Sequence, residues 1–147
     1  MAFSVTSPAF ADSAPVPTQF TCDGSDTPPP LAISDVPEGT RSFAVIMQDP
    51  DAPKGTFTHW LAYDIAAVDR QLKVDKAKSL RNSFGRHGYG GPCPPRGHGP
   101  HRYYFRVYAL DVPSLPVKGE GTGDLEQALE KHTLAIAELM GRYERKR

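Results

Sequence analysis

Proline placement limits what the first third of this chain can fold into. Nine of the 15 prolines fall within residues 1–53. Because proline has no amide hydrogen and breaks the interior of a helix, this region has no room for a long helix and fits short strands joined by turns. The chain is therefore predicted to be mainly β. Its 147 residues suit a single domain over 1–147, which would bury roughly 70% of the surface of the unfolded chain.

Hydrophobic patterns predict where the central strands lie. Ser42–Gln48 is a nearly continuous apolar run, typical of a strand buried on both faces. Two further segments alternate, which is typical of strands with one buried face. In the first, the predicted face contains His59, Leu61, Tyr63 and Ile65, opposite Trp60, Ala62 and Asp64. In the second, it contains His101, Tyr103, Phe105, Val107 and Ala109, opposite Tyr104 and Arg106.

The period changes near the C-terminus. Apolar residues from Leu125 to Met140 recur at helical spacing, with Asp124 at the expected start and Gly141 as the expected stop. One amphipathic helix should therefore pack on the β body, with His132 as a core histidine inside its apolar stripe. A short helix over residues 73–81 is a weaker expectation. The segment 85–101 holds six glycines and four prolines, so it is predicted to be an ordered, functional loop.

Acidic and imidazole side chains stand where these strands meet loops. Asp49 opens the sequence Asp-Pro-Asp-Ala-Pro, whose prolines fix the loop backbone and allow a cis bond. His59 and His101 each begin an alternating run. If they face one another near Asp49, the carboxylate should favour protonated imidazoles and attract anions. Tyr103 adds a hydroxyl donor, and the amides of Gly90 and Gly91 are candidates for a phosphate nest.

Other kinds of site find less support. His59, His101 and Asp49 are a reasonable set of metal ligands, but no ligand spacing supports a metal, and no cofactor is expected. Cys93 beside a histidine is a conceivable nucleophile, yet no nucleophile lies on a Gly-x-Ser-x-Gly elbow, so no catalytic residue is predicted. His87 and His98 are interpreted as solvated turn residues.

Composition excludes several partners. The 17 basic residues balance the 17 acidic ones, and Tyr104 and Arg106 fall opposite Tyr103, so nucleic acid is not expected. No segment reaches the ~18 apolar residues of a membrane span, and no leader pattern is present, so no integral membrane association and a cytoplasmic location are predicted. Cys22 and Cys93 should then be thiols, unless the folded loops bring them together.

Five segments together resemble the phosphatidylethanolamine-binding protein family, which includes the Raf kinase inhibitor protein, and particularly its short bacterial branch. They are Phe20–Gly24, Asp49–Pro53, Phe57–Trp60, Gly88–Pro95 and His101–Tyr103. The resemblance implies an antiparallel β-sandwich with a peripheral C-terminal helix and a shallow pocket for phosphate-like groups. Carried over residue by residue, it predicts eight ligand-binding residues: Asp49, Phe57, His59, Gly91, Pro94, Pro95, His101 and Tyr103.

The same family pattern places Cys22 and Cys93 towards one region, so a bridge under oxidising conditions is expected as an alternative to thiols. The C-terminal segment does not match the one that covers the pocket in mammalian members, so kinase inhibition is not transferred. The predicted function is a non-catalytic binding module for a small anionic ligand, phosphate or phosphoethanolamine-like, in which a regulatory role is left open. The alternative is a kinase or protease inhibitor or scaffold acting through the pocket edge. A homodimer is also left open.

Overall fold

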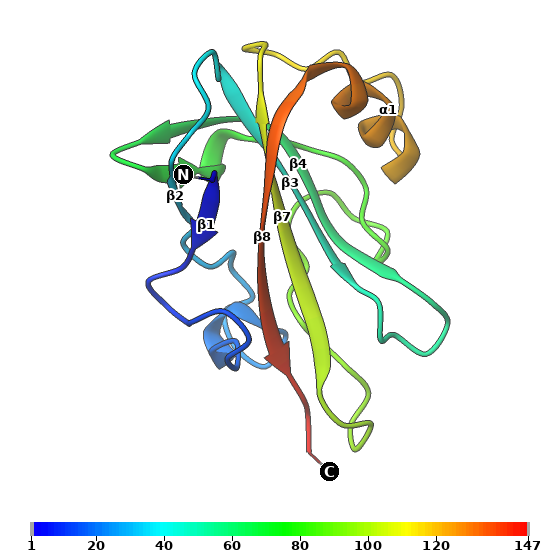
Figure 1. Ribbon diagram of the computed structural model, residues 1–147. Coiled ribbons are helices and arrows are strands. Elements are labelled where there is room, and N and C mark those ends of the chain that lie inside the picture. Colours follow the sequence, from blue (N-terminus) through cyan, green and yellow to red (C-terminus); the bar gives the residue numbers. More distant parts are fainter. Residues whose placement is uncertain (1, 147) are drawn as a thin grey trace.

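An antiparallel sheet forms the body of the computed structural model, which describes residues 2–146. Its eight strands run in the order β1-β2-β5-β4-β3-β7-β8, and β6 also pairs with β4. The strands are β1 (Ser4–Thr6), β2 (Ala32–Ser34), β3 (Ser42–Asp49), β4 (Phe57–Val68), β5 (Gln71–Lys73), β6 (Lys78–Ser79), β7 (His101–Leu110) and β8 (Thr133–Tyr143). One α-helix, α1 (Thr122–His132), lies at one end of the sheet (Figure 1).

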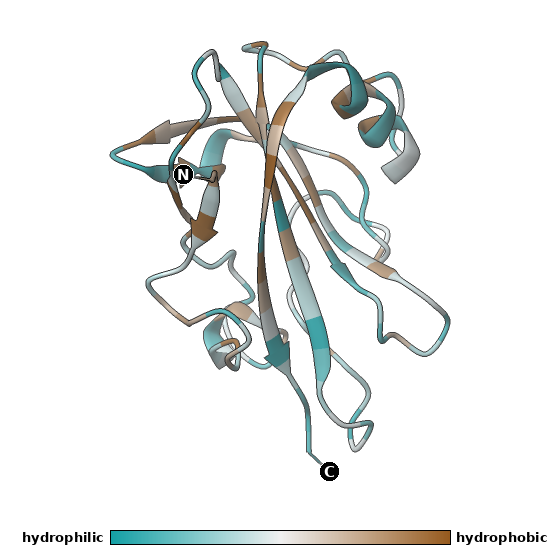
Figure 2. Cartoon of the chain, viewed as in Figure 1, coloured by the Kyte–Doolittle hydropathy of each residue, from teal (hydrophilic) through white to brown (hydrophobic). Residues whose placement is uncertain are grey.

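Hydrophobic clusters lie on both faces of the sheet. The sheet curls until β1 lies beside β8, and it encloses an inner core that includes Val45, Phe105 and Leu139. On the outer face, Ile46 and Leu61 pack with residues of α1. Figure 2 shows hydrophobic residues mainly along the strands. The prediction of a mainly β, antiparallel fold with a peripheral helix is confirmed, with one sheet curved almost into a barrel.

β3 is the central strand, as predicted. It pairs with β4 on one side and β7 on the other, and seven of its eight residues are buried. The alternation predicted for β7 is also confirmed, because Phe105, Val107 and Ala109 are fully buried in the inner core together with Tyr103.

The alternation predicted for β4 holds from Trp60 to Tyr63 but does not extend to His59 and Ile65. Trp60, Ala62 and Ile65 all belong to the inner core, whereas Leu61 belongs to the outer one. Two irregularities in the pairing explain this. Trp60 and Thr58 face consecutive residues of β3, and Ile65 and Ala62 face residues only two apart. Each bulge inserts one residue into β4 and shifts the side-chain period, so Ile65 faces inward together with Trp60 and Ala62.

The C-terminal helix is much shorter than predicted. α1 ends at His132, and the rest of the expected helix is β8, which pairs with β7 from Leu110 to His101. The backbone pairing of a long neighbouring strand has overridden local periodicity. His132 is therefore not a core residue. Its Nδ1 lies 3.0 Å from Asp111 Oδ1 and its side chain is 27% exposed.

Other local predictions also need correction. In place of a helix over residues 73–81, the chain forms a single 3-10 turn, η2 (Val74–Lys76), followed by β6. Residues 85–100 contain no helix or named strand, which confirms the loop. The Asp49–Pro53 loop contains no cis peptide bond. Within residues 2–146, no helix is long and apolar enough to cross a membrane.

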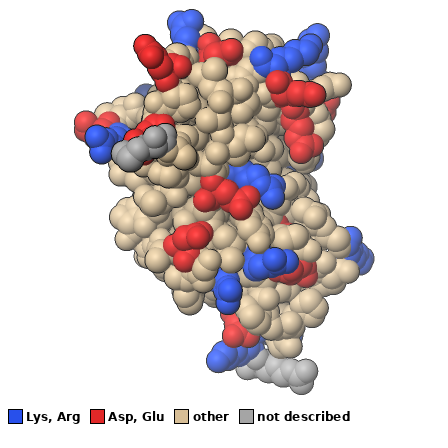
Figure 3. Space-filling view, in the orientation of Figure 1, with Lys and Arg blue, Asp and Glu red and all other residues tan. Residues whose placement is uncertain are grey.

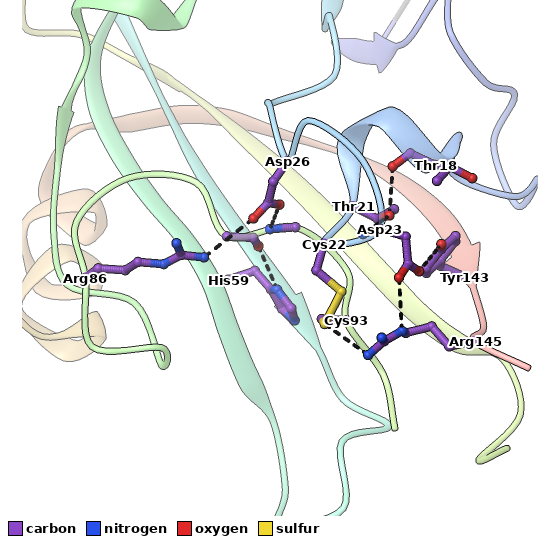
Figure 4. Close-up of a disulfide and its surroundings, with 12 residues drawn as sticks. Thr18, Thr21, Cys22, Asp23, Asp26, His59, Arg86, Cys93, Tyr143 and Arg145 are labelled. Atoms are coloured by element: carbon purple, nitrogen blue, oxygen red, sulfur yellow. Dashed lines mark hydrogen bonds and ion pairs between the residues drawn. A yellow bond between two sulfur atoms is a disulfide. The ribbon is translucent and has the colours of Figure 1, made fainter. Parts of the chain in front are cut away.

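A disulfide joins Cys22 to Cys93, across 71 residues of sequence and with the two Cα atoms 5.4 Å apart. Of the two alternatives left open by the sequence, free thiols and a bridge, the structure has the bridge. Cys22 follows the 3-10 turn η1 (Thr18–Phe20), and its amide donates to Pro92 O at 3.1 Å. The bond therefore ties the N-terminal turn to the long loop (Figure 4). Because most cytoplasms would reduce such a bond, the bridge does not support the predicted cytoplasmic location. That location stays a prediction.

Loss of this bridge should lower the free energy of unfolding by about 2–4 kcal/mol, because it removes a long loop constraint from the unfolded chain. Urea unfolding with and without reductant measures the change. The Cys22→Ser/Cys93→Ser variant is the matched control, since it should resemble the reduced wild type and ignore reductant. Two free thiols in the denatured, non-reduced, air-oxidised protein would contradict the bridge.

Candidate functional site

Three neighbouring strands begin or end together at one end of the sheet. β3 ends at Asp49, while β4 begins at Phe57 and β7 at His101. Antiparallel pairing puts Asp49 opposite Phe57 on one side, and Gln48 opposite Tyr104 on the other. The next pair outward brings Tyr103 beside Asp49. The register of β3 thus gathers side chains from three separate sequence motifs.

A cavity of about 200 Å³ lies among these strand ends. Seven of the eight predicted ligand-binding residues line it: Asp49, Phe57, His59, Pro94, Pro95, His101 and Tyr103. The rest of the lining is Ala52, Pro53, Phe84 and Cys93. The sequence motifs therefore converge on one small site, although Gly91 is not part of its lining.

Gly91 has a structural role. Its amide donates to Asp26 Oδ1 at 2.8 Å, and the neighbouring Gly90 amide donates to His59 O at 3.0 Å. Neither N–H is left for a phosphate nest, so that prediction is corrected. A Cβ on Gly91 would overlap Phe20 O and Asp26 Oδ1. The glycine is needed because the loop packs directly against the N-terminal turn.

His59 is buried in surroundings that favour the neutral imidazole. It is 3% exposed, and its Nδ1 donates to Gly90 O at 2.7 Å, which fixes the proton on that nitrogen. Burial lowers the pKa of His59, and this effect outweighs the Gly90 carbonyl and the Asp49 charge, which raise it. Asp49 does favour the protonated ring, as expected, but burial works against it more strongly in the free protein. Nε2 remains as a hydrogen-bond acceptor.

Asp49 and His101 form a buried pair. Asp49 Oδ2 lies 2.7 Å from His101 Nδ1, and the two side chains are 4% and 2% exposed. The other carboxylate oxygen, Oδ1, accepts from the amide of Asp51 at 2.8 Å. The carboxylate therefore holds a proton on His101 Nδ1 and orients the ring, as a carboxylate does for a functional histidine.

His98 extends this pair, and sequence reasoning missed it. Its Nδ1 lies 2.6 Å from His101 Nε2. Because a hydrogen bond needs one donor, a single proton is shared between these two nitrogens. His98 is exposed, as predicted, but it is a partner of the site. Its position three residues before His101 in a Gly-His-Gly-Pro loop was the available signal.

Tyr103 is fully buried, and its hydroxyl has no hydrogen-bond partner in the described part of the chain. Burial raises the pKa of Tyr103, and the Asp49 charge raises it further. The phenol is therefore a neutral donor. An unsatisfied buried polar group of this kind costs about 1–3 kcal/mol.

Aromatic rings form the wall of the cavity. The Phe57 ring lies 4.9 Å from that of His59 and 4.7 Å from that of Phe84, and His59 lies 5.2 Å from Tyr103. Phe84 had no sequence signal. Its neighbour Ser83 exchanges hydrogen bonds with the backbone of Thr58, which holds Phe84 over the start of β4.

Comparison with known proteins gives consistent matches. A family model described as phosphatidylethanolamine-binding protein matches residues 6–144. The "UPF0098 protein" of Aquifex aeolicus is 49% identical over 150 residues, covering 96% of this chain and 88% of its own. A putative phosphatidylethanolamine-binding protein homolog from Chlamydia trachomatis has a TM-score of 0.87 at 39% identity, with 98% of each chain covered. YbcL of E. coli has a TM-score of 0.85 at 36% identity, covering 98% of this chain and 99% of its own.

Replacing Tyr103 by phenylalanine should leave stability unchanged or raise it by about 1 kcal/mol, because the variant removes an unsatisfied buried hydroxyl. Tyr89→Phe is the matched control. The Tyr89 hydroxyl donates to Phe20 O at 2.7 Å, so its loss should destabilise the protein by about 1 kcal/mol. Urea unfolding of the ligand-free proteins measures both. A loss at Tyr103 equal to that at Tyr89 would mean that the Tyr103 hydroxyl is satisfied.

His59 should also make stability depend on pH. The unfolded histidine takes up a proton near pH 6.5, whereas folded His59 does so only at lower pH. The unfolded state therefore binds more protons below pH 6.5, and stability falls as pH decreases, by at most about 1.4 kcal/mol per pH unit. Urea unfolding at several pH values between 7.5 and 5 should show a smaller fall for His59→Gln. Equal slopes would place the pKa of His59 at its ordinary value.

Proposed function

Since the chain belongs to the phosphatidylethanolamine-binding protein family, we propose that it is a non-catalytic binding protein whose cavity takes a phosphate-bearing group such as phosphoethanolamine. The cavity of about 200 Å³ is smaller than the roughly 300–1,000 Å³ of pockets for drug-sized ligands. It therefore suits a head group better than a whole lipid.

One observation carries this proposal. The Tyr103 hydroxyl is a buried donor that has no partner among residues 2–146, and it belongs to a cavity that also includes His59 and His101. A phosphate oxygen placed there would accept from Tyr103. It would also remove the cost of leaving that hydroxyl unsatisfied.

Protonation of the histidines would complete the site. His59 Nε2 is an acceptor in the free protein, so it can donate to a phosphate oxygen only after gaining a proton. Burial opposes that proton, while a bound anion favours it. Anion binding should therefore draw a proton into the pocket, and a protonated phosphate monoanion could supply that proton itself.

The lining gives little support to catalysis. It contains no serine, threonine or lysine, and Cys93, the candidate nucleophile, is held in the disulfide. A disulfide sulfur is not the thiolate that nucleophilic catalysis needs. His59, His101 and Asp49 remain as groups that bind and orient.

The alternative function is an inhibitor or scaffold that contacts a kinase or a protease through the pocket edge. Pro95, Arg96 and Pro100 are exposed on the loop beside the cavity, so a partner protein could reach this edge. Binding of such a partner should survive changes deep in the pocket. This difference separates the two functions.

Asp49→Asn and His59→Ala should each weaken binding of phosphoethanolamine by about 1–3 kcal/mol, the value of a lost charge-assisted hydrogen bond. His87→Ala is the matched control, because His87 pairs with Glu120 on the surface, with both side chains at least 50% exposed. Titration calorimetry measures the affinities. The double variant should lose less than the sum of the single losses, because both residues act at one site.

The pH dependence of the same titrations adds a further check. Affinity should be higher at pH 6 than at pH 8, because the bound anion favours charged imidazoles. Sulfate is the useful second probe, since its charge does not change over this range. Additive losses or an affinity that rises with pH would contradict the pocket. Turnover of an ester or phosphoester that is abolished by either substitution would replace the binding function with an enzymatic one.

A further inference from the structure

A second cavity, of about 370 Å³, lies beside the first and shares His101 with it. We call it the outer cavity. It is lined by Asp51, His98, Pro100, His101, Arg102 and Arg142. Its only acid is Asp51, so the charges of its two arginines decide what it can bind.

Two arginines form a cross-strand pair on neighbouring strands beside this cavity. Arg102 of β7 lies directly opposite Arg142 of β8. Like charges in directly opposed positions are unfavourable in a sheet. Such a pair persists when another charge compensates it.

Only one of these charges is compensated. Arg102 Nε and Nη2 donate to the two carboxylate oxygens of Asp51 at 2.9 and 2.8 Å. This bidentate bond lowers the pKa of Asp51 to about 2. The carboxylate is therefore already neutralised by Arg102 and has little charge left for Arg142.

Arg142 has no ion pair and no side-chain hydrogen bond among residues 2–146. Glu144, just after the end of β8, lines a different cavity together with Arg142 but forms no ion pair with it. The Arg142 guanidinium is exposed and keeps all five N–H donors. An open cavity thus holds a fixed positive charge with no protein anion assigned to it.

We propose that the outer cavity is a second anion site, in which Arg142 and His98 bind a phosphate group. A guanidinium matches two phosphate oxygens with parallel N–H donors. His98 Nδ1 is engaged with His101, so its Nε2 is the free nitrogen. It can donate to a third oxygen when it carries a hydrogen, as it does where His98 Nδ1 accepts from His101 Nε2. The bound phosphate would supply the charge that compensates Arg142.

This site shares His101 with the proposed pocket, but Arg142 lines only the outer cavity and His59 only the inner one. Each site can therefore be tested through its own residue. The probe is inorganic phosphate, followed by the backbone amide shifts of the ¹⁵N-labelled protein. We expect two sets of shifts with separate affinities, one around Arg102 and Arg142 and the other around His59. Arg142→Gln should weaken the first set at least tenfold and leave the second within about twofold.

Arg41→Gln is the matched control, because Arg41 is another exposed arginine, placed at the opposite end of β3 from Asp49. It should change neither set. His59→Ala should affect the inner set alone. Failure of the inner set to respond to His59→Ala would overturn the proposed pocket while leaving the outer site intact.

A second readout separates binding from a purely structural role. Arg142→Gln removes the like-charge contact, so the ligand-free variant should have a Tm equal to or above that of the wild type, and phosphate should raise its Tm less. Repeating the titration with phosphoethanolamine distinguishes free phosphate from a phosphoester as the source. Outer shifts that survive Arg142→Gln, or that fall equally in Arg41→Gln, would overturn the proposal.

Discussion

The pairing of β3 with β4 on one side and β7 on the other determines almost everything at the pocket. This register carries Asp49, Phe57 and His101 to one end of the sheet, although His101 lies far from the other two in the sequence. Because β3 is central and buried, the edge is supported by strands on both sides. The site is therefore built on the buried centre of the sheet, and the loops complete its lining with residues such as Phe84 and Pro94.

The sequence contains enough information for those parts of the site that depend on strand ends. The alternation of β7 places His101 and Tyr103 on one face without help from any distant residue. β4 could not be predicted in the same way, since its two bulges arise from pairing with β3. Only Asp64, which adopts φ 56°, marks one of them locally. The identity of β8 was likewise hidden, because its apolar spacing fits a helix until β7 is present as a partner.

Residues that act through loop packing were the least predictable. Gly91 stands within a recognisable motif, yet its amide bonds to Asp26, a residue 65 positions away. Phe84 reaches the cavity through the contact of Ser83 with Thr58. The balanced net charge of the chain gave no indication of where charged side chains gather on the surface. Figure 3 shows basic and acidic side chains interspersed on the viewed face, and the local imbalance at Arg142 comes from cross-strand register.

The two bulges of β4 also divide the strand into three segments, and the side-chain alternation restarts in each of them. The segment that contains Phe57 and His59 faces the pocket, the middle segment with Leu61 contributes to the packing under the helix, and the last segment returns to the inner core at Ile65. A strand with perfect alternation could not serve these three environments. An insertion or deletion beyond Asp64 would therefore be absorbed at the second bulge, which insulates the binding end of the strand from variation at the β4–β5 hairpin.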